Sequence, residues 1–132
     1  MVFRIEDTDK ERSKKEYEEN IIECLEWLGI KYDSGPFRQS ERNDTYRKYI
    51  KLLIDNGSAY ISKETEGDRS EVIRFKNPNK KIKFTDLIRG EVEIDTTDLK
   101  DFVIARDMDE PLYHLTVVVD DHEMGITHII RG

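Results

Sequence analysis

The sequence has 132 residues, of which 36% are hydrophobic and 39% are charged, and its formal net charge is −7. This length suits one domain, or one part of a larger domain, and is sufficient to bury a core. The acidic balance excludes a whole-surface attraction to nucleic acid or to an anionic membrane, whereas a local basic patch stays compatible with it.

The chain opens with a short predicted strand that runs into a group of carboxylates. Residues 2–6 have the alternation of a strand, and Glu6, Asp7 and Asp9 fall within four positions at its end. Asp7 and Asp9 are interpreted as helix-entry residues, because the helix macrodipole favours negative charge there. Glu6 lies at the carboxyl end of the strand, where α/β proteins bind their ligands, and is therefore a candidate binding residue.

A helix is predicted over residues 13–29. Ser13 and Glu16 have the spacing of a capping box with Ser13 as the N-cap, apolar residues recur at helical intervals, and Gly29 ends the helix. Cys24 lies among these apolar residues and is expected to be packed. As the only cysteine of the sequence, it allows no internal disulfide and no cysteine-based zinc site.

The next part of the chain predicts a loop, a helix and a strand. Residues 32–37 contain a Gly-Pro pair and predict a loop. Apolar side chains at helical spacing predict a helix over residues 41–55, which an Asn-Gly pair ends. Residues 59–62 predict a short strand, and residues 63–70 predict a polar surface loop.

Two alternating segments, residues 72–76 and 82–84, flank an Asn-Pro-Asn turn signal and predict a hairpin. In this hairpin the basic side chains share the face opposite the apolar one and form a ribbon of Arg74, Lys76, Lys81 and Lys83. Like charges that face each other weaken a hairpin, which favours a polyanionic partner. A solvated surface explains the pattern equally well, so both interpretations stay open.

The last third of the chain returns to mixed structure. Residues 91–95 and 102–106 predict further strands, and residues 127–131 predict a C-terminal strand. Residues 112–121 are ambiguous, because their valines favour a strand whereas Pro111 is typical of a helix start. Strands alternate with helices early and pair with one another later, which predicts an α/β fold with an antiparallel insertion.

Two opposite charges at strand ends indicate a candidate amino-acid site. Arg131 ends the predicted C-terminal strand, and if this strand lies near the first one, Arg131 and Glu6 face one pocket. Such a pair suits a zwitterion, with the ammonium at Glu6 and the carboxylate at Arg131. A structural ion pair between the two residues is the alternative, and their spacing alone favours it.

The sequence gives little support to a metal site or to membrane contact. A calcium loop of the EF-hand type needs glycine where Arg12 stands. A metal site can be drawn from His114, Asp120, Asp121, His122 and His128, but the spacing of these residues is not diagnostic. No apolar segment approaches the ~20 residues of a membrane helix. We therefore expect no metal, no membrane contact and a cytoplasmic protein.

Several longer segments follow one another in a characteristic order along nearly the whole chain. They are FRIEDTDKERS, WLGIKYD, GPFRQSER, LIDNGSAY, VIRFK, FTDLIRGEVEID, DFVIARDMDEPLYHL and VVVDDHEMGITHIIRG. In this order they resemble the bacterial-type glutamyl-tRNA synthetases, a family of class I synthetases. The resemblance implies an α/β fold with a partial Rossmann-like class I synthetase catalytic core in residues 1–60 and 107–132. It also implies a shortened α+β acceptor-arm-binding insertion in residues 61–106.

The resemblance further implies an enzyme, a glutamate–tRNA ligase that activates glutamate with ATP and Mg²⁺ and transfers it to tRNA. By motif position, the implied glutamate-binding residues are Glu6, Tyr113, His114, Leu115, Thr116, Val117 and Arg131, with residues 113–117 on a helix. The basic ribbon of Arg74, Lys76, Lys81 and Lys83 is implied to bind the tRNA acceptor arm.

The resemblance also implies what lies outside this sequence. The family's two ATP signature motifs, of the His-Ile-Gly-His and Lys-Met-Ser-Lys-Ser types, are expected before residue 1 and after residue 132. The chain is therefore expected to be inactive alone, and no catalytic residue is assigned to it. A short polar stretch replaces the zinc segment of many members, so no zinc is expected, and the intact enzyme is expected to be a monomer. The alternatives are a non-catalytic module that binds the tRNA acceptor arm and an amino-acid-binding relative.

Overall fold

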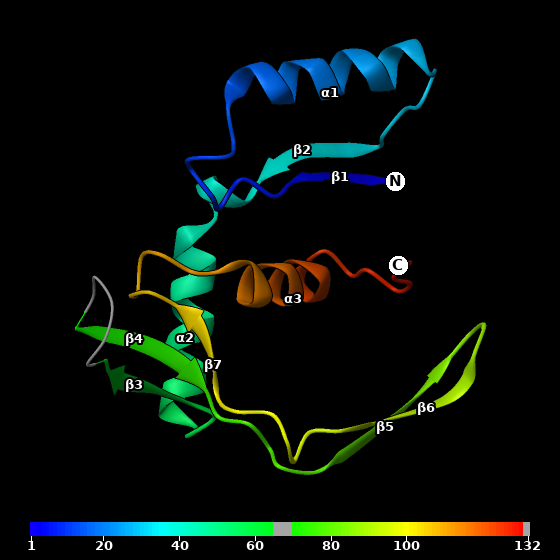
Figure 1. Ribbon diagram of the computed structural model, residues 1–132. Helices are drawn as coiled ribbons and strands as arrows, with labels where there is room; N and C mark the ends of the chain where they lie inside the picture. The colour runs from blue at the N-terminus through cyan, green and yellow to red at the C-terminus, as the bar shows by residue number, and fades with distance from the viewer. Residues whose placement is uncertain (65–69, 131–132) are drawn as a thin grey trace.

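The structure is a computed structural model that describes residues 1–64 and 70–130. Its mixed architecture confirms the predicted α/β class, and Figure 1 shows a small parallel sheet beside a helix, a central body, and a projecting hairpin. The elements in chain order are β1 (Val2–Ile5), α1 (Lys15–Trp27), β2 (Ser34–Arg38), the 3₁₀ helix η1 (Gln39–Glu41), α2 (Asn43–Asp55), β3 (Ala59–Lys63), β4 (Glu71–Phe75), β5 (Lys81–Asp86), β6 (Gly90–Asp95), β7 (Phe102–Ala105) and α3 (Tyr113–Glu123).

Strands β1 and β2 form a parallel pair in which Arg4 lies opposite Phe37. The predicted loop over residues 32–37 is therefore wrong at residues 34–37, and only residues 32–33 lie outside a strand. Gly35 has a φ of +115°, and a Cβ at this position would collide with the backbone of Phe3 on the neighbouring strand. Glycine is thus needed for the close approach of the two strands, which the sequence pattern did not distinguish from a chain break.

Helix α1 begins later and packs less than the sequence predicts. Its N-cap is Lys14 and no side chain caps it, so the predicted capping box at Ser13 is wrong. The Ser13 amide instead donates to the carbonyl of Asp9 at 2.9 Å. Gly29 follows the helix with a φ of +68°, as predicted. No residue of α1 is buried, and Cys24 is exposed, contrary to expectation.

The core of the body lies where α2 and α3 pack against the antiparallel sheet β3–β4–β7. Tyr46 and Ile50, on the apolar face predicted for α2, are fully buried, and Leu115 and Val119 of α3 pack in the same cluster. The ambiguous segment around residues 112–121 is helical, as the family resemblance implies. Burial of one helix face here outweighs the strand preference of the valines.

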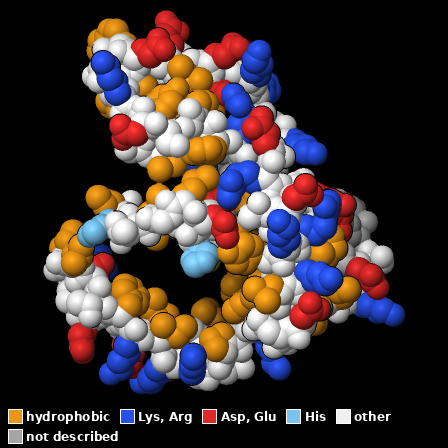
Figure 2. All heavy atoms as spheres, turned by 180° about the vertical axis from the view of Figure 1, so that it is seen from behind, with side chains coloured by type: hydrophobic (Ala, Val, Ile, Leu, Met, Phe, Trp, Pro, Cys, Tyr) orange, Lys and Arg blue, Asp and Glu red, His pale blue; other side chains and the backbone are white. Residues whose placement is uncertain are grey.

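The projecting hairpin consists of β5 and β6, and we call it the arm (Figure 1). The predicted pairing of residues 72–76 with residues 82–84 is wrong, because β4 pairs with β3 and β7 whereas β5 pairs with β6. Ile82 and Phe84 on the arm are about half exposed. Figure 2 shows an open gap between the arm and the rest of the molecule, with hydrophobic side chains along its border.

The segment after α3 differs from the prediction. Residues 126–130 have no regular structure, so the predicted strand over residues 127–131 is wrong in its described part. The predicted polar loop lies largely in residues 65–69, which are outside the described residues. In the part of the chain that the structure describes, no helix has the length and apolarity needed to cross a bilayer.

Candidate functional site

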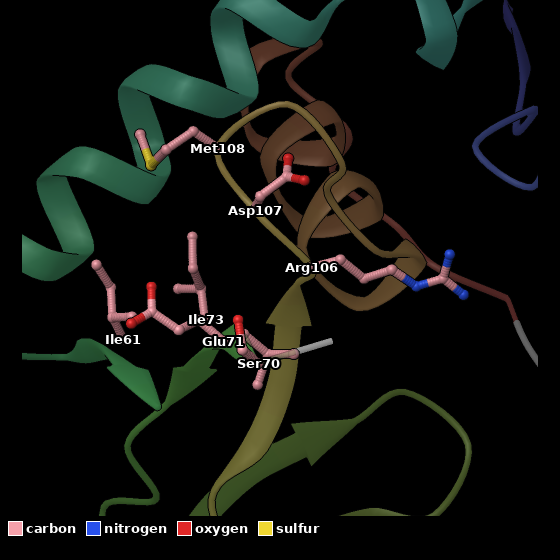
Figure 3. A pocket seen from close by; sticks show the side chains of 8 residues that line it. Ile61, Ser70, Glu71, Ile73, Arg106, Asp107 and Met108 are labelled. Atoms are coloured by element: carbon pink, nitrogen blue, oxygen red, sulfur yellow. The ribbon is translucent and has the colours of Figure 1, made fainter. Parts of the chain in front are cut away.

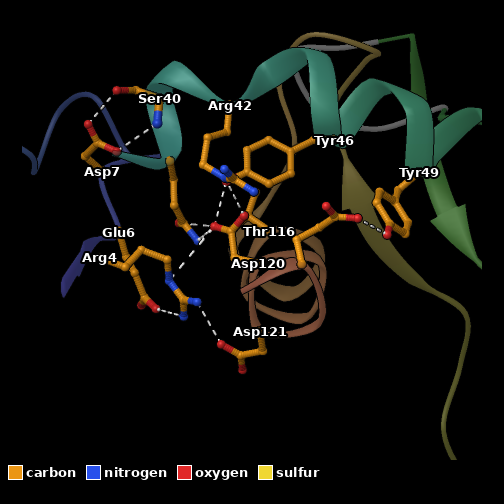
Figure 4. Close-up of polar contacts among 12 residues, drawn as sticks. Arg4, Glu6, Asp7, Ser40, Arg42, Tyr46, Tyr49, Thr116, Asp120 and Asp121 are labelled. Carbon is orange, nitrogen blue, oxygen red and sulfur yellow. Dashed lines mark hydrogen bonds and ion pairs between the residues drawn. The ribbon is translucent and has the colours of Figure 1, made fainter. Parts of the chain in front are cut away.

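An ion-pair network lies at the carboxyl end of β1, with Arg4 as its central cation (Figure 4). Arg4 Nη2 donates to Glu6 Oε1 at 2.8 Å, and Arg4 Nη1 donates to Asp121 Oδ1 at 2.7 Å. The side chain of Arg4 is 14% exposed, whereas that of Glu6 is 37% exposed. Arg4 therefore fixes Glu6 at the surface against helix α3, although Arg4 and Asp121 lie 117 positions apart in the sequence.

Asp120 is the buried centre of the same network. Its carboxylate is fully buried and accepts hydrogen bonds from Gln39 Nε2 at 3.0 Å, Tyr46 Oη at 2.8 Å and Arg42 Nε at 2.8 Å. Arg4 Nε is buried and lies 3.9 Å from Asp120 Oδ2, with no hydrogen-bond partner among the described residues. Asp120 thus joins α3 to η1 and α2, and it faces the cation of β1.

The pKa values of the groups around Asp120 shift in directions that follow from this packing. Burial acts to lower the pKa of Arg4, but hydrogen bonds to its two carboxylate partners outweigh burial and raise it overall. Burial likewise opposes ionisation of Arg42, and the hydrogen bond to Asp120 raises its pKa. Burial, followed by the bond to Asp120, raises the pKa of the Tyr46 phenol. These shifts keep both guanidinium groups charged and the phenol neutral.

The charges of this cluster do not cancel. Two guanidinium groups face three carboxylates, and the five residues are Arg4, Arg42, Glu6, Asp120 and Asp121. The cluster therefore has a formal excess of one negative charge, located where the first strand of the fold ends. A cationic group such as an ammonium is the ligand that this excess would attract.

The residues predicted for glutamate binding on α3 have different surroundings. Consecutive helical residues are turned by about 100° from one another, so residues 113–117 spread around the helix axis. Leu115 and Val117 are buried, and Leu115 belongs to the core cluster. The His114 ring lies edge-on to Phe102, with 6.0 Å between the ring centroids. Tyr113, at the start of the helix, is 41% exposed.

Thr116 connects this helix to the buried network. It is fully buried, and its hydroxyl donates to Gln39 Oε1 at 3.2 Å. Gln39 in turn donates to Asp120, so one amide joins two residues of α3 across the start of η1. Of the residues predicted on this helix, Thr116 is therefore the one that hydrogen bonds into the network near Glu6.

The other carboxylates of the acidic turn are not helix-entry residues of α1. Asp7 accepts hydrogen bonds from the amide of Ser40 at 2.9 Å and from the hydroxyl of Ser40 at 2.6 Å. Its carboxylate therefore binds the amino end of η1 and not that of α1. Asp9 Oδ1 accepts from the amides of Glu11 and Arg12, which closes a turn before α1 begins. Both carboxylates shape the chain that follows Glu6.

Arg131, the predicted carboxylate-binding residue, lies outside the described residues, so its pairing with Glu6 stays a prediction. Among residues 1–64 and 70–130, no group of three or more His, Cys, Asp or Glu side chains is arranged to hold a metal. Asp120 and Asp121, which the sequence allowed in such a site, contact arginines.

The four basic residues predicted to bind tRNA do not share one face. Arg74 lies in β4 and Lys76 directly follows it, whereas Lys81 and Lys83 lie in the arm. Both arm lysines contact Glu93, with Nζ–oxygen distances of 2.8 Å and 3.1 Å. The ribbon is therefore divided between two sheets, and its part on the arm is neutralised in part by a cross-strand carboxylate.

A surface pocket of about 470 Å³ lies away from this network, between β3, β4 and the loop after β7 (Figure 3). Apolar side chains of Ile61, Ile73 and Met108 form part of its wall, while Arg106 extends away from them. None of the predicted binding residues lines it. We assign the candidate site to the charged network, because the network contains a predicted binding residue, Glu6, whereas the pocket contains none.

Four residues of the network were not identified as site residues from the sequence: Arg4, Gln39, Arg42 and Tyr46. A signal for Arg4 existed. It is a single charge inside a parallel strand, and parallel strands are usually covered on both faces, so a buried charge there requires a partner. The sequence contains no comparable signal for Gln39 or Arg42, since their burial depends on how η1 meets α3.

Comparisons with known proteins show which family the chain belongs to. The family described as "tRNA synthetases class I (E and Q), catalytic domain" matches residues 1–68 and 61–132. The chain belongs to this family. Among curated relatives, the glutamate–tRNA ligases of Aquifex aeolicus (strain VF5) and Sulfurihydrogenibium sp. (strain YO3AOP1) are 45% and 42% identical to it. Both alignments cover the whole chain, but only 36% and 37% of the relatives, so the chain spans little more than a third of their length.

A solved structure supports the same assignment. The crystal structure of a glutamate tRNA ligase from Elizabethkingia meningosepticum CCUG26117, in complex with its amino acid, matches with a TM-score of 0.88 and 32% identity. The match covers 99% of this chain and 36% of that one. The mixed α/β fold of a class I synthetase catalytic domain is thereby confirmed.

The alignments also bear on the middle of the chain. The Sulfurihydrogenibium alignment extends over 176 positions although this chain has 132 residues, and the family match comes in two pieces that overlap at residues 61–68. The alignment with the glutamate–tRNA ligase 1 of Rubrobacter xylanophilus spans only 132 positions, so the shortening of the insertion stays a prediction. Its boundaries at residues 61–106 stay a prediction.

Proposed function

We propose that this chain is part of the catalytic domain of a glutamate–tRNA ligase and that the network at the end of β1 holds the α-ammonium of glutamate. The observation that carries the proposal is the excess negative charge around Arg4. Glu6 is the most exposed carboxylate of that network, since Asp121 is 17% exposed and Asp120 is fully buried. An ammonium at Glu6 would neutralise the excess through a charge-assisted hydrogen bond. The names of the relatives support glutamate as the amino acid.

The remaining predicted residues take different parts in this proposal. Tyr113, exposed at the start of α3, contacts the substrate directly, and Arg131 holds a substrate carboxylate. Leu115 and Val117, which are buried, shape the pocket wall through packing. Thr116 acts through its hydrogen bond to the buried network.

ATP with Mg²⁺ is the proposed co-substrate of the whole ligase, where it would supply the energy of the activation step. The carboxylate network does not fit a polyphosphate, because its excess charge is negative. We therefore assign no residue of this chain to ATP. The proposal also includes a monomeric, cytoplasmic enzyme, with no zinc in this chain.

The glutamate proposal can be tested in a chimera, the Aquifex aeolicus relative with its matching segment replaced by these 132 residues. We expect glutamate-dependent ATP–pyrophosphate exchange. Glu6→Gln should raise the KM for glutamate about 10- to 100-fold, the scale of one charge-assisted hydrogen bond, and leave the KM for ATP unchanged. Asp9→Asn, in the same acidic turn, is the matched control. An equal effect of both variants, or a preference for another amino acid, would contradict the proposal.

We propose that the β5–β6 hairpin of the protein binds the acceptor arm of tRNA through Lys81 and Lys83. Since both lysines contact Glu93, Glu93→Gln should release them and tighten tRNA binding, with a steeper dependence on salt. The double variant Lys81→Ala/Lys83→Ala should weaken binding and flatten that dependence. Affinities of the chimera for its tRNA at several salt concentrations measure both effects, and a Glu93→Gln variant that binds no tighter would exclude this contact.

A further inference from the structure

The arm is joined to the body through two chain segments that run side by side, and we call them the neck (Figure 1). The neck consists of residues 76–80, which lead from β4 to β5, and residues 96–101, which lead from β6 to β7. A two-stranded hairpin has little stability of its own, so its orientation depends on how such a connection is held. The neck is not a simple flexible linker, because it contains two buried polar side chains.

Asn77 is one of these side chains and is 5% exposed. Its amide nitrogen donates to the carbonyl of Thr96 at 2.6 Å and to the carbonyl of Leu99. Its backbone amide donates to Asp101 Oδ1 at 2.8 Å. Asn77, on the segment that leads from β4, therefore hydrogen bonds to three residues of the segment that leads to β7.

Thr96 repeats the connection at the arm end of the neck and is 6% exposed. Its hydroxyl donates to the carbonyl of Lys80 at 2.7 Å, and its Oγ1 accepts from the amide of Lys80 at 3.0 Å. At the body end, Asp101 Oδ2 accepts from the Tyr60 hydroxyl at 2.9 Å. The hydrogen bonds thus run without interruption from the first strand of the body sheet to the base of the arm.

We propose that Asn77 is a positioning residue that fixes the angle between the arm and the body, so that the arm is held ready for the RNA acceptor end. This role rests on the proposed function only for the identity of the partner. Asparagine is suited to it, because its amide offers two N–H donors to two carbonyls on the facing segment. Aspartate offers no donor there, and alanine removes both hydrogen bonds, after which the Thr96 carbonyl keeps only the Leu99 amide at 3.1 Å. A rigid arm also loses less conformational freedom when it binds.

The first test measures the angle of the arm directly in the 132-residue chain. With Cys24 replaced by serine, spin labels are placed at Leu87, in the exposed turn of the arm, and at Lys51, on the exposed side of α2. Double electron–electron resonance should give one narrow distance distribution. Asn77→Ala should at least double its width. A broad distribution before the substitution, or an unchanged width after it, would overturn the proposal.

Asn43→Ala is the matched control, since Asn43 also donates its side-chain amide to a backbone carbonyl, that of Asp109 at 3.2 Å. Asn43 lies in the body and not in the neck, so Asn43→Ala should leave the width of the distance distribution unchanged. If Asn43→Ala broadens the distribution as much as Asn77→Ala does, the effect is a general loosening and the proposal fails. Thr96→Val, which removes the second connection, should broaden the distribution in the same direction as Asn77→Ala.

The second test separates this inference from the proposed function. In the chimera, Asn77→Ala should raise the KM for tRNA in aminoacylation about tenfold, the scale of one to two lost hydrogen bonds. Glutamate-dependent ATP–pyrophosphate exchange should be unchanged, because the neck is remote from Glu6. A chimera without glutamate activation contradicts the proposed function, and the distance measurement still decides on Asn77. A fall in both activities would indicate a structural defect and contradict a positioning role.

Discussion

Replacing Asp120 with alanine tests whether the buried network holds the molecule together. Asp120 is fully buried and accepts three hydrogen bonds, one of them from the guanidinium of Arg42. Removing one partner of a buried charged pair typically costs about 3–5 kcal/mol, because the other charge is left uncompensated. The side chain of Arg42 is 24% exposed, so water relieves part of this cost. We therefore expect a loss near the lower limit, about 3 kcal/mol.

This loss is large compared with the stability of a small domain, about 5–15 kcal/mol. Urea denaturation of the chain, followed by far-ultraviolet circular dichroism, should show a midpoint lowered by at least about 1 M urea. Asp109→Ala is the control, since its carboxylate pairs with Arg47 at the surface and is 67% exposed. Such a pair contributes less than about 1 kcal/mol. A shift for Asp120→Ala no larger than that of Asp109→Ala would refute the reasoning.

Three further expectations concern other parts of the chain. Glu18→Ala removes the contact between Glu18 of α1 and Arg38 of β2 and, because no residue of α1 is buried, should speed amide hydrogen exchange in α1 alone. Faster exchange in α2 as well would contradict this. The hydrogen bond from the backbone amide of Asn77, and then the one from the Tyr60 hydroxyl, lower the pKa of Asp101 below its ordinary value of 3.8. The stabilisation of the neck by the Asp101 carboxylate is therefore fully present above pH 3.8 and is lost as the pH falls through the lowered pKa. The distance distribution between arm and body should accordingly broaden only in strong acid. The isolated chain should show no glutamate-dependent ATP–pyrophosphate exchange above a Glu6→Ala control, and exchange above that level would show that it activates glutamate alone.

Features that depend on neighbouring residues could be predicted from the sequence. Tyr46 and Ile50 lie on one face of α2 because their spacing matches the helical period, and both are fully buried. Gly29 follows α1 with positive φ because few other residues adopt that conformation without strain. These outcomes require no knowledge of which segments meet in space.

Features that depend on distant pairing were predicted less well. The alternating pattern of β4 is compatible with a hairpin between β4 and β5. In the structure β4 pairs instead with β3 and with β7, and β7 follows the arm in the sequence. Alternation specifies a strand and its faces and does not specify its partner. The contact of Arg4 with Asp121 is of the same kind, since nothing local to either residue identifies the other. Glu6 could be singled out by its place at a strand end, whereas the cation that holds it could not.

In the described part of the chain, Asp120 and Asn77 are buried polar centres that lie at joints between elements. Asp120 lies where β1 meets α2 and α3, and Asn77 lies where the arm meets the body, whereas the core of the body is mainly apolar. Apolar packing tolerates small shifts between elements, but a buried hydrogen-bonded group is satisfied in only one arrangement. We infer that the core supplies most of the stability, while these two side chains fix the relative placement of the parts that carry Glu6 and the arm lysines. Substitution of Asn77 should accordingly alter tRNA recognition before it abolishes folding, whereas substitution of the fully buried Asp120 should lower both the stability and the affinity for glutamate.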